Sequence, residues 1–307
     1  MKNNSFIYLL ILLLPLQILN AQDLLDKLDK EFPDETQYTQ ATFKAGRITF
    51  GQSVETRKKG VFEINVHTKF WNIPNSNTQS FGADLATTRF GVEYAFTDRF
   101  TSGVGVASFD GIFNGYTKYR LLRQKDSDNK APIGITLFNS ISYQTRDFNH
   151  IDLQEGFSNR LAFASQVIIA RKFDRNFSLQ ITPTFVRRNS EQFPDSPSNH
   201  FALGFGARYK VGRHVSIVSE YYYVANPIES DPDHLEFFSP FALGVNWEVS
   251  DLILQFSMTN TRAFDEATNI VNTFNNFNFN DGNLHIGVSA TYILHFNKKK
   301  RYQQDNK

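Results

Sequence analysis

Hydrophobic and polar residues alternate along most of this chain, and residues 284–296 (LHIGVSATYILHF) show the pattern most clearly. One parity is apolar throughout: Leu284, Ile286, Val288, Ala290, Tyr292, Leu294 and Phe296. The other parity is polar or small apart from Ile293: His285, Gly287, Ser289, Thr291 and His295. Since successive side chains of a strand point to opposite faces, this pattern predicts a two-faced β-strand. A tilted strand needs about 9–11 residues to cross a bilayer, so this strand is long enough to do so.

The same alternation recurs along the chain and predicts twelve strands. They cover residues 62–70, 89–96, 100–109, 113–121, 133–144, 161–169, 177–185, 201–209, 215–223, 241–247, 252–258 and 284–296. Short turns rich in Asp, Asn, Gly and Ser, such as 174–176, alternate with long polar links, such as 260–283. Short turns on one rim and long loops on the other are typical of outer-membrane barrels. The short link at Asp110-Gly111 and the long link at 124–132 are exceptions to this alternation.

Three features favour a barrel whose apolar face points outward to lipid. Twelve strands enclose more space than side chains fill, since about 8 strands already give a packed interior. The apolar parity carries no charge except Arg123, Arg171 and Arg187, all near strand ends, where the cost of a charge in a bilayer is small. Aromatic residues gather near strand ends, as at Phe96 and Phe100, which suits interface girdles. A soluble β-sandwich or a ligand-filled soluble barrel is the alternative.

The N-terminus reads as an export signal. Lys2 precedes an apolar run from Phe6 to Leu14, and Leu19-Asn20-Ala21 offers a small residue at a cleavage site. We therefore predict that residues 1–21 form a cleaved signal peptide; an uncleaved membrane anchor is the alternative. The chain has no cysteine, which excludes lipoprotein anchoring and disulfides.

The overall charge and composition limit the classes of function. The net charge is +1, which gives no reason to expect nucleic-acid binding. Phenylalanine is unusually frequent, with 31 copies, yet no stretch after the signal is long and apolar enough for a transmembrane helix. The expected partners are outer-membrane lipid, lipopolysaccharide and the barrel-assembly machinery; no protein partner can be named. The expected location is the outer membrane of a Gram-negative bacterium.

The opposite parity of the strands supplies candidates for lining a lumen. These charged residues are Glu63, Lys69, Arg89, Glu93, Lys118, Arg120, Arg208, Lys210, Glu220 and Glu248. Basic residues outnumber acidic ones on this parity, and rings of Arg and Lys favour anions, so we expect a mild anion bias. A purely structural interpretation is that Arg89, Lys118 and Arg208 pair with Glu93 and Glu220 across neighbouring strands.

The alternation of the strands divides the mature chain into three parts. Residues 22–60 precede the first strand and are expected to be a periplasmic segment, which could be a solvated lead, a plug or an extra strand. Residues 61–296 are expected to form the barrel. Residues 297–307, with a basic run from Lys298 to Arg301, are expected to be a solvated periplasmic tail.

Signatures of enzymes, metals and cofactors are weak or missing in the sequence. His214-Val215-Ser216 has the spacing of a barrel phospholipase pair but lies beside a short turn, and Asp231, Asp233 and His234 lie in an acidic loop. His285 and His295 are roughly 33 Å apart along one strand, too far to share a metal. We expect no cofactor, no metal and no enzymatic activity; a barrel hydrolase is a minor alternative.

Several segments resemble a known family. They are ATFK and GRI at 41–48, GQSVET at 51–56, Lys59-Gly60, a set between Phe81 and Arg99 that includes Arg89 and Glu93-Tyr94, and KYRLLRQ at 118–124. This pattern is similar to a Bacteroidota family of predicted outer-membrane β-barrel proteins of unknown function. The resemblance covers most of the mature chain and implies architecture and location but no activity. It also weakens the interpretation of residues 41–60 as a simple spacer and makes a plug or an extra strand an equal alternative.

The sequence therefore predicts an all-β protein: a transmembrane antiparallel up-and-down β-barrel of about twelve strands. The function that fits best is a pore for small polar solutes with a mild anion bias. The alternative is a closed barrel that acts as a structural or partner-binding protein.

Overall fold

A computed structural model describes residues 38–71, 85–125, 131–146, 156–190, 197–228, 236–277 and 284–296. The predicted signal peptide, residues 22–37 and the basic tail 297–307 lie outside these described residues, as does the Asp231–His234 group.

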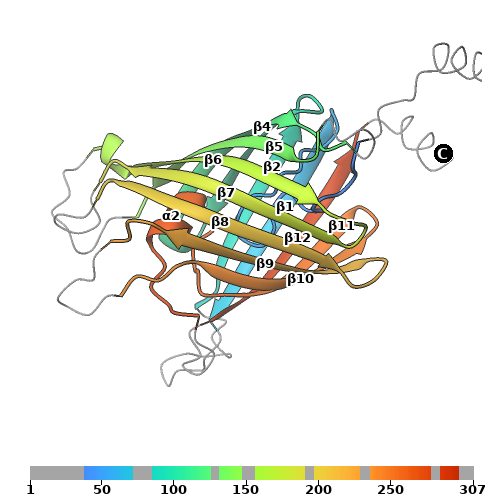
Figure 1. Ribbon diagram of the computed structural model, residues 1–307. Helices are drawn as coiled ribbons and strands as arrows, with labels where there is room; N and C mark the ends of the chain where they lie inside the picture. The colour runs from blue at the N-terminus through green and yellow to red at the C-terminus, as the bar shows by residue number, and fades with distance from the viewer. Residues whose placement is uncertain are drawn as a thin grey trace, which may run out of the picture.

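Twelve strands form one closed antiparallel barrel (Figure 1). Each strand pairs with its sequence neighbours, and β1 pairs with β12 to close the ring. The strands are β1 (Val61–Trp71), β2 (Thr87–Ala95), β3 (Phe100–Ala107), β4 (Ile112–Leu122), β5 (Gly134–Gln144), β6 (Leu161–Lys172), β7 (Phe177–Arg188), β8 (Asn199–Lys210), β9 (Val215–Val224), β10 (Phe241–Val249), β11 (Leu252–Thr259) and β12 (His285–His295). The predicted strand number and up-and-down order are confirmed, and a sandwich is excluded.

The two rims of the barrel differ in the length of their connections. Tight turns join β2 to β3, β6 to β7, β8 to β9 and β10 to β11 at the rim where β1 begins and β12 ends, which we call the short-turn rim. The other rim, the long-loop rim, carries the extended links (Figure 1). Both exceptions expected from the sequence are present: η2 (Phe109–Gly111) tightly links β3 to β4, and a longer link follows β4. Asp110 and Gly111 adopt positive φ angles of 54° and 57°, which lets the chain reverse so tightly there.

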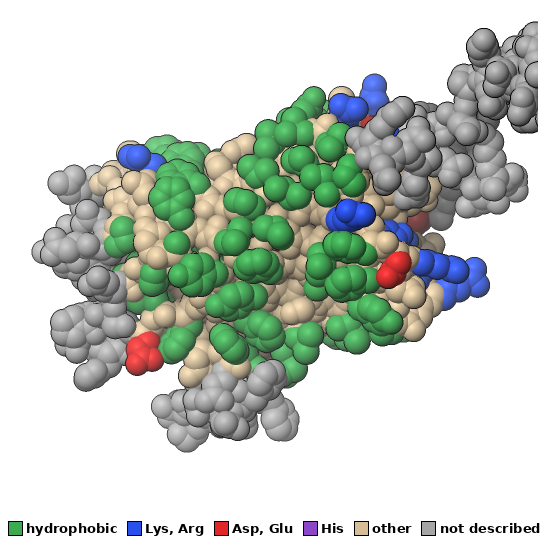
Figure 2. Space-filling view, viewed as in Figure 1, with side chains coloured by type: hydrophobic (Ala, Val, Ile, Leu, Met, Phe, Trp, Pro, Cys, Tyr) green, Lys and Arg blue, Asp and Glu red, His purple; other side chains and the backbone are tan. Residues whose placement is uncertain are grey.

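Side chains on the outer surface are apolar, and those inside are mostly polar. Phe90, Phe113 and Tyr223 are 58%, 55% and 55% exposed, whereas Arg89 and Lys118 are each 1% exposed. Figure 2 shows hydrophobic side chains spread over the visible wall, with charged side chains towards its two ends. This distribution is the reverse of a soluble protein and is what a barrel in lipid requires.

Aromatic side chains stack at the short-turn rim. Tyr94 and Phe96 meet edge to face at 4.9 Å, and the rings of Phe173 and Phe177 lie 5.9 Å apart across the β6–β7 turn. Arg171, one of the three charges on the apolar parity, lies 5.2 Å from the Phe173 ring at the same end. These placements suit the membrane–water interface, where aromatic rings and long basic side chains are well accommodated.

Two segments outside the strands enter the barrel. Residues 39–56 pass from the short-turn rim into the interior, where most of their side chains are buried. From the long-loop rim, the β11–β12 connection turns inward and carries helix α2 (Glu266–Val271), whose six residues are all buried. We call the described part of this connection, residues 260–277, the α2 loop. No helix in the described part of the chain is long and apolar enough to cross a membrane.

Candidate functional site in the barrel lumen

Eight of the ten candidate lumen residues are buried in the barrel interior, and Lys210 and Glu248 are partly exposed near the short-turn rim. The buried eight are Glu63, Lys69, Arg89, Glu93, Lys118, Arg120, Arg208 and Glu220. Their inward direction follows from strand parity, because the neighbouring positions on each strand are the apolar ones that face outward.

A hairpin of the N-terminal segment, residues 46–53, lies in the middle of this interior, and we call it the luminal hairpin. The Ile48 amide donates to the Gly51 carbonyl at 2.9 Å, and the Ser53 amide donates to the Gly46 carbonyl at 2.9 Å. Arg47 and Gln52 form the bridge between its two arms. The turn at its tip therefore comprises residues 48–51. No thirteenth barrel strand arises from residues 38–60, because the described strand order closes without them.

Glu220 on β9 holds the tip of the luminal hairpin. Its carboxylate accepts hydrogen bonds from the amides of Thr49 at 2.9 Å, Phe50 at 3.0 Å and Gly51 at 3.1 Å, and from the Thr49 hydroxyl. Successive amides that converge on one anion form a concave nest, which favours negative charge. Gly51 is required by the fit: a Cβ there would lie 2.5 Å from Glu220 Oε1 and 2.6 Å from the Tyr222 hydroxyl.

Wall side chains also bond to the backbone of this segment. Gln180 on β7 accepts from the Val54 amide at 3.0 Å and donates to the Gln52 carbonyl at 2.8 Å. Thr136 on β5 donates to the Val54 carbonyl at 2.7 Å. Gln255 on β11 donates to the Ile48 carbonyl, and Lys118 on β4 donates to the Gly46 carbonyl. With Glu220 on β9, five strands around the ring therefore bond to residues 46–54.

Charged groups of the wall find partners on the N-terminal segment. Arg57 lies 2.5 Å from Glu63, and Arg120 lies 3.1 Å from Glu55. Lys44 lies 2.9 Å from Glu248. Each pair joins one residue of the segment to one residue of the wall.

Three wall groups converge on Gly46. A Cβ added there would lie 3.6 Å from Glu93 Oε2, 3.7 Å from Lys118 Nζ and 3.8 Å from Glu63 Oε2. The Lys118 ammonium donates to the Gly46 carbonyl at 2.7 Å, and the Tyr116 hydroxyl donates to Glu93.

The cross-strand pairing expected for Arg89, Arg208 and Glu220 is wrong. Arg208 lies 3.6 Å from Glu248, Glu220 is occupied by the hairpin amides, and Arg89 donates to Asn65 at 2.7 Å and to Asn114. The expectation failed because it considered only the wall, whereas the N-terminal segment competes for the wall's acidic groups.

Apolar contacts add to these polar ones. Phe43, Ile48 and Val54 of the N-terminal segment form a buried cluster with inward wall residues, including Tyr116 and Phe138. Phe50 packs against Tyr222 with ring centroids 5.7 Å apart. The segment is therefore packed as well as hydrogen-bonded.

Helix α2 approaches the luminal hairpin from the long-loop side. Asp265 caps the helix by accepting from the Thr268 amide at 3.1 Å and from the Thr268 hydroxyl at 3.0 Å. Burial raises the pKa of Asp265 above its usual range, and the hydrogen bonds from Thr268 oppose that rise. Ala267, Ile270 and Val271 belong to an apolar cluster with wall residues, so the loop is seated on the wall.

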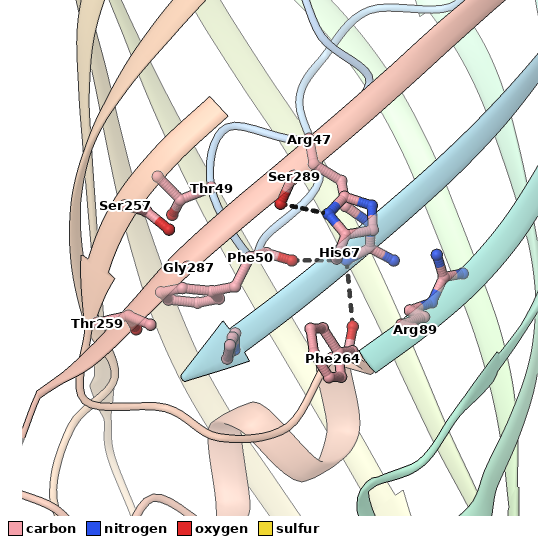
Figure 3. A pocket seen from close by; sticks show the side chains of 11 residues that line it. Arg47, Thr49, Phe50, His67, Arg89, Ser257, Thr259, Phe264, Gly287 and Ser289 are labelled. Atoms are coloured by element: carbon pink, nitrogen blue, oxygen red, sulfur yellow. Dashed lines mark hydrogen bonds between the residues drawn. The ribbon is translucent and has the colours of Figure 1, made fainter. Parts of the chain in front are cut away.

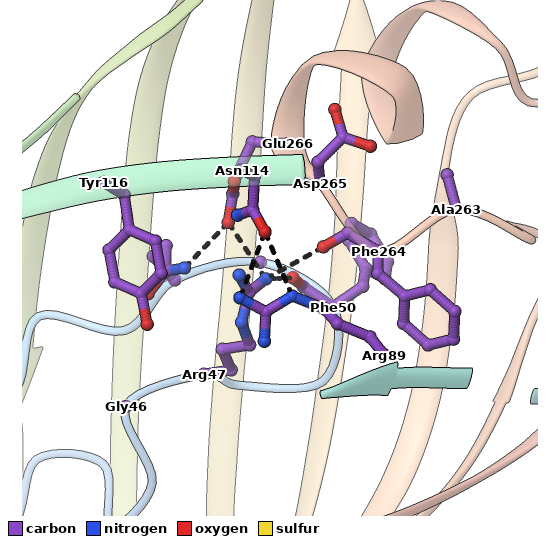
Figure 4. Close-up of polar contacts among 12 residues, drawn as sticks. Gly46, Arg47, Phe50, Arg89, Asn114, Tyr116, Ala263, Phe264, Asp265 and Glu266 are labelled. Carbon is purple, nitrogen blue, oxygen red and sulfur yellow. Dashed lines mark hydrogen bonds and ion pairs between the residues drawn. The ribbon is translucent and has the colours of Figure 1, made fainter. Parts of the chain in front are cut away.

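The luminal hairpin and the α2 loop are bonded to each other (Figure 4). Arg47 Nη1 lies 2.9 Å from Glu266 Oε1 and donates to the carbonyls of Phe50 at 2.6 Å and Phe264 at 3.3 Å. Gln52 Nε2 donates to the same Glu266 oxygen at 2.7 Å. Lys69 on β1 donates to the Thr261 hydroxyl at 2.9 Å and to the Ala263 carbonyl at 2.5 Å.

Sequence reasoning missed Arg47, Gln52, Asp265 and Glu266. The sequence did contain a signal for α2, because Asp265 followed by Glu266 and Thr268 is typical of a helix start. It contained none for the pairing of Arg47 with Glu266, which depends on closure of the barrel.

A small cavity remains between the luminal hairpin, the wall and Phe264 (Figure 3). Its volume is about 20 Å³, which is room for about one water molecule. A solute larger than a water or a small ion does not fit there while the hairpin and the loop are in place.

The histidine and serine positions considered for catalysis are not assembled into a site. Ser216 is buried and accepts from Arg208 Nε at 3.3 Å, whereas His214 is exposed in the β8–β9 turn. His285 is buried on β12, while His295 lies at the short-turn rim, 3.8 Å from Asp251. Among the described residues there is no group of His, Cys, Asp and Glu that could hold a metal ion.

Comparison with known proteins defines the class of this protein. A family model described as "Membrane bound beta barrel domain (DUF5777)" matches residues 43–294, so the chain belongs to this family of membrane β-barrels. The matched range includes the luminal hairpin as well as the twelve strands. A search of curated proteins found no match.

Solved porins share the barrel architecture at low similarity. The NanC porin is 6% identical, with 76% of this chain and 98% of the porin covered and a TM-score of 0.44. The KdgM porin is 9% identical, with 76% and 99% covered and a TM-score of 0.43. OmpF of Salmonella typhi is 10% identical, with 76% and 97% covered and a TM-score of 0.37. The closed barrel itself is established by the strand pairing.

Proposed function

We propose that this protein is an outer-membrane channel for small polar solutes, closed at rest by residues 39–57 and by the inward-turned α2 loop. Displacement of the N-terminal segment opens it. In this proposal the short-turn rim faces the periplasm, residues 1–21 direct export, and the barrel-assembly machinery inserts the protein among lipid and lipopolysaccharide.

The observation that carries the proposal is the number of polar contacts between the N-terminal segment and the wall, which lie beside the apolar cluster of Phe43, Ile48 and Val54. Glu220, Gln180 and Lys118 bind the backbone of residues 46–54, and Glu63 and Arg120 pair with Arg57 and Glu55. Polar groups of this kind are solvated by water once the segment leaves, whereas a continuous apolar contact would resist exposure. The segment can therefore be removed at lower cost than a wholly apolar plug of the same size.

The mild anion bias is part of the same proposal. Lys69, Arg89, Lys118, Arg120 and Arg208 remain on the wall after the segment is displaced, against Glu63, Glu93, Glu220 and Glu248. A lumen with excess Arg and Lys favours anions.

The second candidate is a closed barrel that acts as a structural or partner-binding protein. The contact of Arg47 with Glu266 favours it, since segments from both rims meet there, and the cavities found beside these segments among the described residues are small, about 10 to 20 Å³. This candidate predicts no conductance under any condition.

Deletion of residues 22–60 tests the proposal in planar bilayers. We expect ion-selective current steps with slightly higher permeability for chloride than for potassium, and steps that are rare or absent with the intact chain. Heat-modifiable mobility on a denaturing gel checks that the deletion variant still forms a barrel. Silence of a correctly folded deletion variant would favour the closed barrel.

A further inference from the structure

The small cavity beside the luminal hairpin has an unusual set of lining groups. Three of its lining residues are basic: Arg47 from the hairpin, Lys69 from β1 and Arg89 from β2. No carboxylate is among the lining residues, although several hydroxyls are: Thr49, Ser257, Thr259 and Ser289. The lining therefore offers donors and positive charge.

Two of these charges have only neutral partners. Arg89, 1% exposed, donates to the amide oxygens of Asn65 and Asn114. Lys69, 7% exposed, donates to a hydroxyl and to a backbone carbonyl. Within the described part of the chain neither forms an ion pair. Buried charges normally have a charged partner, because removal from water is costly.

Each acidic group in this region has a partner on one oxygen, although Glu266 Oε2 and Asp265 Oδ1 have no hydrogen-bond partner among the described residues. Glu266 accepts from both Arg47 and Gln52, and Glu93 accepts from the Tyr116 hydroxyl. Asp265 caps α2. They lower the electrostatic potential at longer range, but none of them lines the cavity.

One donor nitrogen of the Arg47 guanidinium lacks an acceptor. Its Nη1 reaches Glu266 and two carbonyls, but its buried Nη2 has no hydrogen-bond partner among the described residues. Arg47 is 7% exposed, so bulk water does not readily supply the missing acceptor. Figure 3 shows Arg47, His67 and Arg89 on one side of the cavity.

We propose that this cavity binds one small inorganic anion of about the size of chloride. An anion would accept from Arg47 and offset the charges of Arg89 and Lys69, whereas a water molecule could satisfy the donors but not the charges. The small volume of about 20 Å³ favours a single-atom anion over larger carboxylates and phosphates. The inference goes beyond the proposed channel, because it concerns the closed barrel and requires no conduction.

The bound anion would connect the luminal hairpin to the wall. Arg47 belongs to the hairpin, while Lys69 and Arg89 belong to neighbouring strands β1 and β2. Halide should therefore stabilise the packed position of the N-terminal segment. Stabilisation by a ligand that binds only the folded protein begins near its dissociation constant and then grows with the logarithm of its concentration.

The experiment uses the full-length protein purified in detergent with gluconate as the only anion. The melting temperature is measured while gluconate is exchanged for chloride or bromide at constant ionic strength. We expect the melting temperature to rise with both halides once their concentration exceeds the dissociation constant, and then to increase with the logarithm of the concentration. In Arg89→Gln the concentration at which the rise begins should increase by at least about tenfold. Arg208→Gln is the matched control, since Arg208 is also buried on the wall but is absent from the cavity lining.

If Arg89→Gln does not fold, the site can still be tested with crystals of the unmodified protein grown in bromide, whose anomalous scattering locates a bound halide. An anomalous peak within hydrogen-bond distance of Arg47 and Arg89 would support the site. A melting temperature indifferent to halide, or a cavity without an anomalous peak, would overturn the proposal and leave only water in the cavity.

Discussion

The guanidinium of Arg47 lies 2.9 Å from the carboxylate of Glu266, which joins a hairpin near the start of the chain to the loop before its last strand. Both side chains are almost fully buried, at 7% and 1% exposure. The two inserted segments therefore stabilise each other as well as binding the wall.

Arg47→Ala should destabilise the packed interior, because it leaves Glu266 buried with only Gln52 as a partner. Loss of one member of a buried pair costs about 3–5 kcal/mol. Thermal or denaturant unfolding in detergent would measure the loss. Arg146→Ala is the control: its pair with Asp110 spans 3.9 Å and Arg146 is 68% exposed, so a change within about 0.5 kcal/mol is expected. Equal effects of both variants would show that the buried pair has no special role.

Gly51→Ala should release the tip of the luminal hairpin. The added methyl group would lie 2.5 Å from Glu220 Oε1, where three backbone amides converge on that carboxylate. Overpacking of this kind costs about 1–3 kcal/mol. Limited proteolysis should cut residues 39–57 faster in this variant. Gly212→Ala is the control, since a Cβ there meets nothing within 4 Å, and it should leave the cleavage rate unchanged.

Seating of the α2 loop should weaken as pH rises. Burial raises the pKa of Asp265, neighbouring Glu266 acts in the same direction, and Thr268 and Arg188 oppose it. The seated carboxyl thus takes up a proton more readily than the same carboxyl on a released loop. Its contribution is complete below the pKa of the released form and is lost as pH rises through the higher pKa of the seated form.

Protease cleavage within residues 260–277 would measure this effect. Cleavage should become faster in the parent protein as pH rises above the ordinary pKa of an aspartate, about 3.9. Asp265→Asn keeps a good helix-capping side chain but cannot titrate, so its cleavage should vary less with pH. The same pH dependence in both proteins would rule out Asp265 as the cause.

The barrel could be predicted from the sequence because lipid imposes one rule on every strand. Outward positions such as Phe90, Phe113 and Ile286 must be apolar, and that requirement is visible as a period of two. The sequence signal for helix α2 is weaker and consists of its capping residue Asp265 and the acidic Glu266 in its first turn.

The interior could not be predicted in the same way. The luminal hairpin has no period, and its partners Glu220, Gln180 and Gln255 come from β9, β7 and β11. These side chains surround residues 46–54 only after the barrel has closed. Eight of the ten charged residues proposed for the lumen are buried. Their partners depend on a segment whose path the sequence does not encode locally.

A reversible covalent link between the hairpin segment and the wall tests the proposed closure most directly. The chain has no cysteine, and a Cβ at Gly134 would lie 3.4 Å from a methyl carbon of Val54, close enough for a disulfide in the double variant Val54→Cys, Gly134→Cys. Single-channel current is recorded from the same protein before and after reduction, with each single variant as a control. We predict that the disulfide abolishes the rare current steps of the intact chain and that reduction restores them. Steps that occur equally often in both states would contradict closure by the N-terminal segment.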